Sequence, residues 1–149
     1  MAQPPRLTEI FTSSEHYFVT TCTLNRRAIL TTDSIHEQFR TFCQNGSEYG
    51  AFVGRYVIMP DHIHLFVCFH ESATGISGWM KSLKNTLSKG LRKESHVAPH
   101  WQKGFFDHLL RSEESYAQKW QYTRMNPVRA GLVQKPEDWA YQGEILPSG

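Results

Sequence analysis

The stretch that decides the fold is Tyr56-Val-Ile-Met-Pro-Asp-His-Ile-His-Leu-Phe-Val-Cys68. Apolar and β-branched residues fill both of its ends, and Pro60-Asp61 in the middle is a turn signal. Residues 51–59 are therefore predicted to form one strand and residues 62–69 the next. Because only a short connection joins them, we expect the two strands to pair as an antiparallel hairpin.

His62 and His64 open the second of these strands. Side chains two positions apart in a strand point to the same face, about 7 Å apart along the chain, so both imidazoles are able to bind one metal ion. Ile63 points the other way, into the core. The spacing alone does not make a metal site, since strands also carry packed or solvent-facing histidines. A third ligand is needed: His70 has the same parity but follows the strand end, and the turn explains Asp61.

The composition is that of an ordinary folded domain. Of 149 residues, 40% are hydrophobic and 13% aromatic, which is enough for a real core. We predict one domain over residues 1–149, with its core at about 16–139 and short flexible ends. The net charge of +2 is too small to establish a polyanionic partner. Without a long apolar run or a basic-then-apolar leader, we expect a cytoplasmic protein with no membrane span and no secretory signal.

The cysteines exclude some classes of site. Cys22, Cys43 and Cys68 are odd in number, widely spaced and set among apolar residues. This pattern favours reduced thiols in the core over disulfides or a zinc cluster.

The remaining segments complete the order of elements. Hydrophobic periodicity predicts strands at 16–24 and 105–109 and helices at 34–49, 77–93 and 112–125, the last ended by Pro127. The order β, α, β, β, α, β, α is that of a split β-α-β layout. We therefore predict an α+β, ferredoxin-like fold, in which an antiparallel sheet carries helices packed on one face.

The last predicted helix carries a second group of polar residues. Tyr122 and Asn126, four positions apart, share a face that lies off the stripe of Tyr116, Trp120 and Thr123. One interpretation is that the Tyr122 ring packs beside the core and hydrogen-bonds its hydroxyl. The other is that its phenolic oxygen faces a metal site, to which the amide one turn later contributes an oxygen. Helix geometry leaves both open.

These parts have a common chemical use in phosphodiester cleavage. A phosphodiester resists attack because it is anionic, and a divalent ion neutralises that charge and polarises a phosphoryl oxygen. A tyrosine oxygen is then able to act as the nucleophile and form a covalent phosphotyrosine, which keeps the energy of the broken bond for later rejoining. The phenol has a reference pKa of about 10, so it must lose its proton during the attack.

Four segments, taken together, resemble one family. They are Met59-Pro-Asp-His-Ile-His-Leu65, Trp101-Gln-Lys-Gly-Phe-Phe-Asp-His108, Arg111-Ser-Glu-Glu114 and Tyr122-Thr-Arg-Met-Asn-Pro-Val-Arg-Ala-Gly-Leu-Val133. In this order they resemble the HUH single-tyrosine transposases of bacterial insertion sequences, most closely the REP-associated tyrosine transposase branch. The similarity runs from about Tyr17 to Trp139.

The resemblance implies a mechanism. Tyr122 would be the nucleophile, and His62, His64 and Asn126 would bind Mg²⁺ or Mn²⁺. The protein would be a transposase: a metal-dependent endonuclease and strand transferase that cuts single-stranded DNA beside a hairpin, leaving a 5′-phosphotyrosine and a 3′-hydroxyl. The fold it implies is the same ferredoxin-like sheet.

The sequence also departs from the family pattern. Thr123 stands where an isoleucine usually follows the tyrosine, and Asn126 where shorter relatives have glutamine. Neither change removes a reacting group. The short segment after Val133 leaves both a monomer and a homodimer open.

Basic residues are the predicted DNA contacts. They are Arg26, Arg27, Lys81, Lys84, Lys89, Arg92 and Lys93. A solvated helix face is the alternative for each one singly. Trp79 and Trp101 are either base-stacking residues or part of the core.

Two other functions compete with transposition. A domesticated hairpin-binding protein would keep the fold and lose the chemistry, although the intact His, His and Tyr set argues against it. A phosphoesterase acting on small phosphate esters would need the histidines but not Tyr122.

Overall fold

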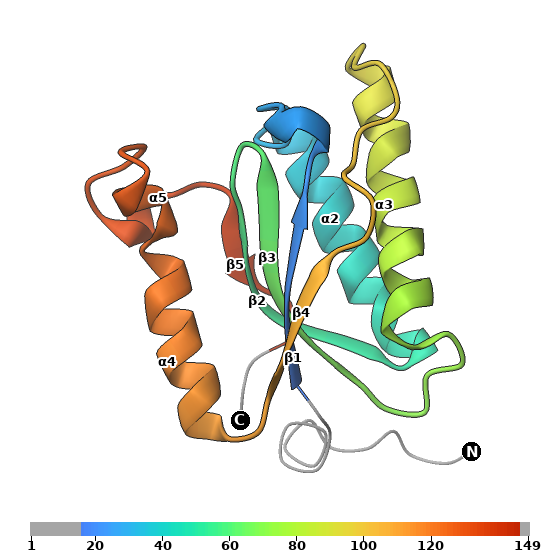
Figure 1. Ribbon diagram of the computed structural model, residues 1–149, viewed down its shortest axis with the longest axis vertical. Coiled ribbons are helices and arrows are strands. Elements are labelled where there is room, and N and C mark those ends of the chain that lie inside the picture. The colour runs from blue at the N-terminus through green and yellow to red at the C-terminus, as the bar shows by residue number, and fades with distance from the viewer. Residues whose placement is uncertain (1–15, 147–149) are drawn as a thin grey trace.

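The computed structural model describes residues 16–146; the expected flexible ends at 1–15 and 147–149 lie outside the described residues (Figure 1). The elements are β1 (His16–Cys22), η1 (Leu24–Arg26), α2 (Asp33–Asn45), η2 (Gly46–Tyr49), β2 (Ala51–Ile58), β3 (His62–Phe69), α3 (Gly75–Lys93), β4 (Phe106–Leu110), α4 (Glu113–Arg124), α5 (Asn126–Arg129), η3 (Pro136–Asp138) and β5 (Gln142–Glu144). No helix within 16–146 is long and apolar enough to cross a bilayer.

The described strands form a five-stranded antiparallel sheet in the order β4-β1-β3-β2-β5. The predicted hairpin lies at its centre, where the backbone N–H of Met59 donates to the carbonyl of His62 at 2.8 Å. This confirms the α+β, ferredoxin-like prediction. The segment after Trp139 was expected to belong to a flexible end, but it forms edge strand β5 against β2.

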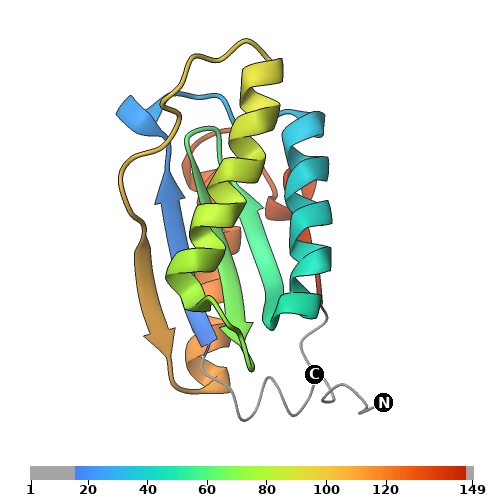
Figure 2. The same cartoon turned by 90° about the vertical axis from the view of Figure 1, so that its right-hand side faces the viewer.

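Helices α2 and α3 cover one face of the sheet, as Figure 2 shows. Alternating residues of the central strands, such as Val19, Ile63 and Leu65, point to this side and are fully buried. The apolar stripes of the two helices pack onto them through Ile35, Phe39, Leu83, Leu87 and Leu91. The Thr32 hydroxyl begins α2 by accepting from the Ile35 N–H at 3.3 Å.

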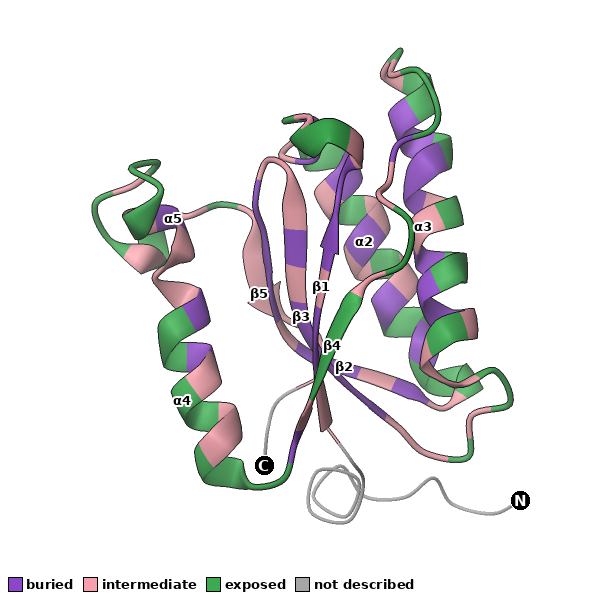
Figure 3. Cartoon of the chain, in the orientation of Figure 1, coloured by how far each residue is buried: buried purple, intermediate pink, exposed green. Residues whose placement is uncertain are grey.

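Helix α4 packs on the opposite face, which refines the expectation of helices on one face only (Figures 1 and 3). Phe18 and Phe66 have the other strand parity, so their side chains point to this side of the sheet. Trp120 of α4 packs with them and keeps them from water. The sheet therefore lies between two helical layers. We call its α4 side the site face, because it carries His62 and His64.

The last predicted helix ends within one residue of the predicted Met125, but the role of Pro127 differs. α4 stops at Arg124, and Pro127 lies in the first turn of α5 instead of ending a helix. A proline costs little there, since the first helical N–H groups have no partner within the helix. Similarly, the predicted helix 34–49 divides into α2 and η2, which ends at Gly50 in the left-handed region at φ +81°.

The cysteines are free and buried, as predicted. Burial raises the pKa of the Cys68 thiol to about 12 and that of Cys43 well above its usual value. Both therefore stay protonated at neutral pH and behave as core residues.

Candidate functional site

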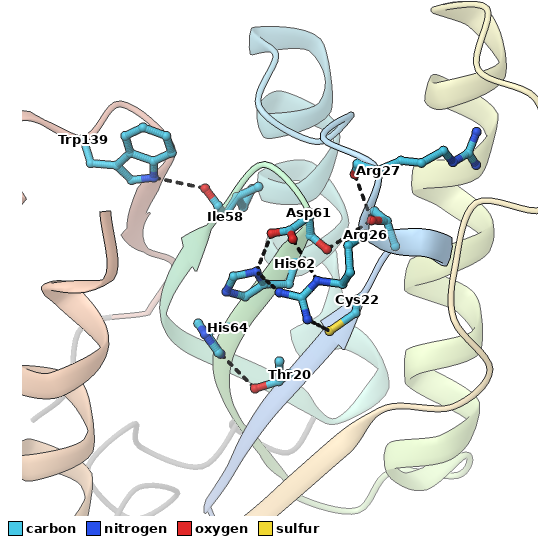
Figure 4. A network of polar contacts seen from close by, with 10 residues as sticks. Thr20, Cys22, Arg26, Arg27, Ile58, Asp61, His62, His64 and Trp139 are labelled. Atoms are coloured by element: carbon cyan, nitrogen blue, oxygen red, sulfur yellow. Dashed lines mark hydrogen bonds and ion pairs between the residues drawn. The ribbon is translucent and has the colours of Figure 1, made fainter. Parts of the chain in front are cut away.

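The two histidines of β3 lie side by side on the site face (Figure 4). Their ring centroids are 4.7 Å apart with the ring planes at 78°. On the neighbouring strand β1, Cys22 is paired with His62 and Thr20 with His64. Ile63 is fully buried on the other side, so the predicted alternation is correct.

His64 is held from two directions. The Thr20 hydroxyl lies 2.8 Å from its Nδ1, and Phe18 stacks on its ring at 5.2 Å with the planes 19° apart. Burial lowers the pKa of His64 to about 3, helped by neighbouring His62 when that ring is protonated and by the positive charges of Lys119, Arg129 and Arg26. The ring is therefore a neutral imidazole at physiological pH, which is the form that binds metal.

His62 is oriented by a carboxylate. Its Nδ1 lies 2.7 Å from Asp61 Oδ1, and Arg26 Nε donates to Asp61 Oδ2 at 2.8 Å. Arg26 Nη2 is also 3.3 Å from the same Nδ1, but that nitrogen cannot donate and accept at once. The shorter contact identifies Nδ1–H as the donor to Asp61. Burial raises the pKa of Asp61, but the hydrogen bonds from Arg26 and His62 outweigh it and leave the pKa below its usual value.

These contacts leave the same nitrogen available on both rings. Each Nδ1 has a protein partner, whereas neither Nε2 is hydrogen-bonded to another described residue. Histidine ligands of metals usually have this arrangement, because a partner at the second nitrogen sets the tautomer and the ring orientation. The residues therefore fit a metal ion. Within residues 16–146, no cluster of three or more His, Cys, Asp or Glu side chains is placed to hold a metal ion.

Tyr122 lies near the end of α4 with its side chain 65% exposed. The guanidinium carbon of Arg129 lies 3.9 Å from the ring centroid, and Arg129 Nη1 donates to the Tyr122 carbonyl at 2.8 Å. The interpretation as a packed tyrosine is wrong for Tyr122. It fits Tyr116 instead, whose hydroxyl accepts from the Arg55 N–H at 3.4 Å and whose pKa burial raises to about 12.

Asn126 begins α5, one turn after Tyr122. Its side chain is half-buried and has no hydrogen bond to another described residue, so its amide oxygen is available. Within residues 16–146, Tyr122 makes no ring contact with either histidine. The structure thus leaves the Tyr122 hydroxyl and the Asn126 amide without a hydrogen-bond partner among the described residues, and it does not join them to the histidine pair.

Two cations on the site face were not among the predicted residues. Lys119 Nζ lies 4.7 Å from the centroid of the Phe18 ring, which in turn stacks on His64. Lys119 and Arg129 both lower the pKa of His64, so both charges act at the histidines. Neither forms an ion pair with another described residue. The signal in the sequence was the i, i+3 spacing of Lys119 and Tyr122, which puts them on one helix face.

Asp61 and Thr20 were also missed as site residues. The turn was a sufficient explanation for Asp61, although its position directly before the histidine pair was a usable signal. Thr20 becomes visible only through the pairing of β1 with β3.

Of the predicted basic residues, the structure brings only Arg26 to the histidines. Arg27 Nη2 donates to the carbonyls of Val97 and Pro99 at 3.0 and 2.8 Å. Lys84 donates to the carbonyls of Gln102 and Gly104, and burial lowers its pKa. The other four are exposed on α3, across the sheet from the site face: Lys81, Lys89, Arg92 and Lys93.

The two tryptophans belong to the core. Trp79 is 5% exposed and packs against Phe42. Trp101 is partly buried against the core and donates from Nε1 to the Ser88 hydroxyl at 3.0 Å.

Comparison with known proteins gives a consistent result. The family model described as transposase IS200-like matches residues 11–120, which include both histidines and end before Tyr122. A Haemophilus influenzae protein provisionally named a REP-associated tyrosine transposase is 29% identical over 141 residues, covering 88% of this chain and 80% of the relative. The Escherichia coli REP-associated tyrosine transposase is 24% identical over 127 residues, covering 84% and 73%.

A solved structure shares the fold. It is a REP-associated tyrosine transposase bound to a REP hairpin, and it superposes with a TM-score of 0.71 at 20% identity, covering 95% of this chain and 82% of that one.

Proposed function

This chain belongs to the IS200-like transposase family, and from that premise we propose that it is a metal-dependent endonuclease and strand transferase acting on single-stranded DNA beside hairpins. The observation that carries the proposal is the histidine pair. Both rings are held at Nδ1 and present Nε2 on one face, beside two cations that have no acidic partner within residues 16–146.

The ligands of the metal ion would be His62 and His64 through Nε2 and Asn126 through its amide oxygen. Mg²⁺ and Mn²⁺ accept such nitrogen and oxygen ligands. When bound, the ion would neutralise the scissile phosphate and polarise a phosphoryl oxygen. Asp61 sets the tautomer and orientation of the His62 ring, and Thr20 holds the orientation of the His64 ring.

Tyr122 would supply the nucleophile. Its oxygen forms a bond to phosphorus, the bond from phosphorus to the 3′ oxygen breaks, and the phenolic proton ends on the released 3′-hydroxyl. The DNA on the 3′ side is then held as a 5′-phosphotyrosine. Attack by the 3′-hydroxyl of another strand reverses these changes and frees Tyr122.

The DNA class follows from the relatives and from the charge of the face. The similar solved transposase was bound to a REP hairpin. In this chain, Lys119 and Arg129 place positive charge beside His64, where a phosphate would lie. We therefore propose a hairpin with an adjoining single strand as the substrate.

The test is capture of the covalent intermediate. Hairpins made from inverted repeats flanking the gene, labelled at the 3′ end, are incubated with the protein and Mg²⁺ or Mn²⁺ and separated under denaturing conditions. We expect a labelled protein adduct with the wild type and none with Tyr122→Phe. A 5′ label should leave with the free fragment, because the phosphotyrosine retains the 3′ part of the strand.

Tyr116→Phe is the matched control, since this tyrosine lies on the same helix but is partly buried against the core and has a raised pKa. It should still form the adduct. An adduct that persists in Tyr122→Phe contradicts the nucleophile assignment. Tight hairpin binding without any adduct would instead indicate the domesticated binding protein, and hydrolysis of a small phosphodiester by Tyr122→Phe would indicate the phosphoesterase.

A further inference from the structure

Edge strand β4 exposes a phenylalanine that the fold does not use. Phe105 and Phe106 are consecutive, so their side chains point to opposite faces. Phe105 packs against the core under α3, whereas Phe106 is 70% exposed. Figure 3 shows β4 as a largely exposed strand at the edge of the sheet. A single exposed ring is common on protein surfaces, so its position relative to the histidine pair decides whether it has a use.

The register places Phe106 on the site face. Phe106 is paired with Thr20 on β1, and Thr20 is paired with His64 on β3. These three residues form one row across the sheet. With strands about 4.8 Å apart, the Phe106 and His64 backbones lie about 10 Å apart.

The charges around this row suit a nucleic acid. Lys119 lies above Phe18, the next residue of β1 on the same face. Asp107, the acidic residue of β4, is paired with Val19, whose side chain is in the core, so its carboxylate points to the other face. The residues of β4 that point to the site face are Phe106, His108 and the buried Leu110, and none of them is acidic. A row with an exposed aromatic ring and nearby cations is how proteins hold single-stranded bases.

We propose that Phe106 is the stacking platform for one unpaired base next to the scissile phosphate, and so helps to set where the strand is cut. This rests on the proposed function, because it takes the phosphate position from the histidine pair. The base would stack on the Phe106 ring while its phosphate lies toward His64 and Lys119.

The test pairs a protein variant with a modified DNA. Binding of the hairpin substrate is measured in the Tyr122→Phe background with Mg²⁺, so that no cleavage occurs. The unpaired nucleotides beside the hairpin are replaced one at a time by an abasic residue. We expect Phe106→Ala to weaken binding of the intact DNA about tenfold and to have no further effect at one abasic position. Phe106→Trp should restore binding.

Tyr49→Ala is the matched control. Tyr49 is an aromatic residue of nearly equal exposure, 71%, just before Ala51, which is paired with Phe69 at the end of β3 away from His62. The Tyr49→Ala variant should bind the intact DNA and each abasic DNA with the same affinity as Tyr122→Phe alone. Thermal melting of each variant confirms folding.

Three outcomes would overturn the inference: unchanged binding by Phe106→Ala, an equal loss at every abasic position, or a change from dimer to monomer in sedimentation, which would make Phe106 a protein contact. Because binding is measured without cleavage, the result holds whether or not Tyr122 forms an adduct.

Discussion

Thr20 and His64 face each other across β1 and β3, with the threonine hydroxyl 2.8 Å from His64 Nδ1. This contact joins the sheet register to the chemistry of the site, because it occupies Nδ1 of the ring, while Nε2 has no hydrogen-bond partner among the described residues. Its counterpart at the other histidine is Asp61, 2.7 Å from His62 Nδ1.

Thr20→Val removes the hydroxyl while keeping the side-chain shape. Without this partner the His64 ring loses a contact that holds its orientation, and we expect affinity for Mn²⁺ to fall about 10- to 100-fold by titration calorimetry. Thr21→Val is the control, since its buried hydroxyl has no hydrogen-bond partner in the described part of the chain and its side chain points to the opposite face. Equal affinity of the two variants would contradict this role for Thr20.

Asp61→Ala should weaken Mn²⁺ binding by a similar factor, because His62 loses the carboxylate that orients it and Arg26 loses its ion pair. Asp61→Asn retains an oxygen that accepts from Nδ1–H, so its affinity should be intermediate. Asp107→Ala, an exposed carboxylate directed away from the site face, should bind like the wild type. If Asn and Ala have the same effect at position 61, the hydrogen bond is not what orients His62.

His64 should make the metal-free protein sensitive to acid. Its pKa is about 3 in the folded chain, against an ordinary value of 6.5. Between these values the unfolded chain binds a proton that the folded chain does not, so stability is lost as the pH falls from 6.5 toward 3.

The slope contributed by one such group is at most about 1.4 kcal/mol per pH unit. Urea unfolding in EDTA at a series of pH values measures it. His64→Gln should give a shallower loss of stability over this window. A slope equal to that of the wild type would show that His64 is not kept neutral by the fold.

Lys119→Gln should reduce the salt dependence of DNA binding. For a single strand of about six nucleotides, too short to extend around the sheet to α3, loss of one phosphate contact should lower the slope of log K against log salt by about 0.7. Lys89→Gln, exposed on α3, should leave the slope unchanged with this DNA. The reverse result would place the DNA on the α3 side.

Much of the fold could be predicted because its signals are local. The hairpin at 51–69 follows from strand-forming residues on either side of Pro60-Asp61, and the helices α2 and α3 follow from their apolar spacing. The position of α4 could not be predicted in this way, since it depends on Phe18 and Phe66. Their aromatic side chains point to the second face of the sheet and are buried there by α4.

The predicted DNA contacts show the same limit. Arg27 and Lys84 are basic residues whose side chains turn to backbone carbonyls of the segment before β4. Composition identifies the charge, but a long side chain is directed by whichever acceptors the fold brings within reach.

The sequence by itself determined that His62 and His64 share a face, because side-chain direction in a strand alternates with a period of two and needs no other segment. Only the tertiary structure decided what surrounds them. Thr20 comes from a strand about forty residues earlier, Lys119 and Arg129 come from the other end of the chain, and Phe106 reaches the same row through β1. Those relations depend on strand register and layer packing, which follow from the burial of the whole core and not from any local pattern.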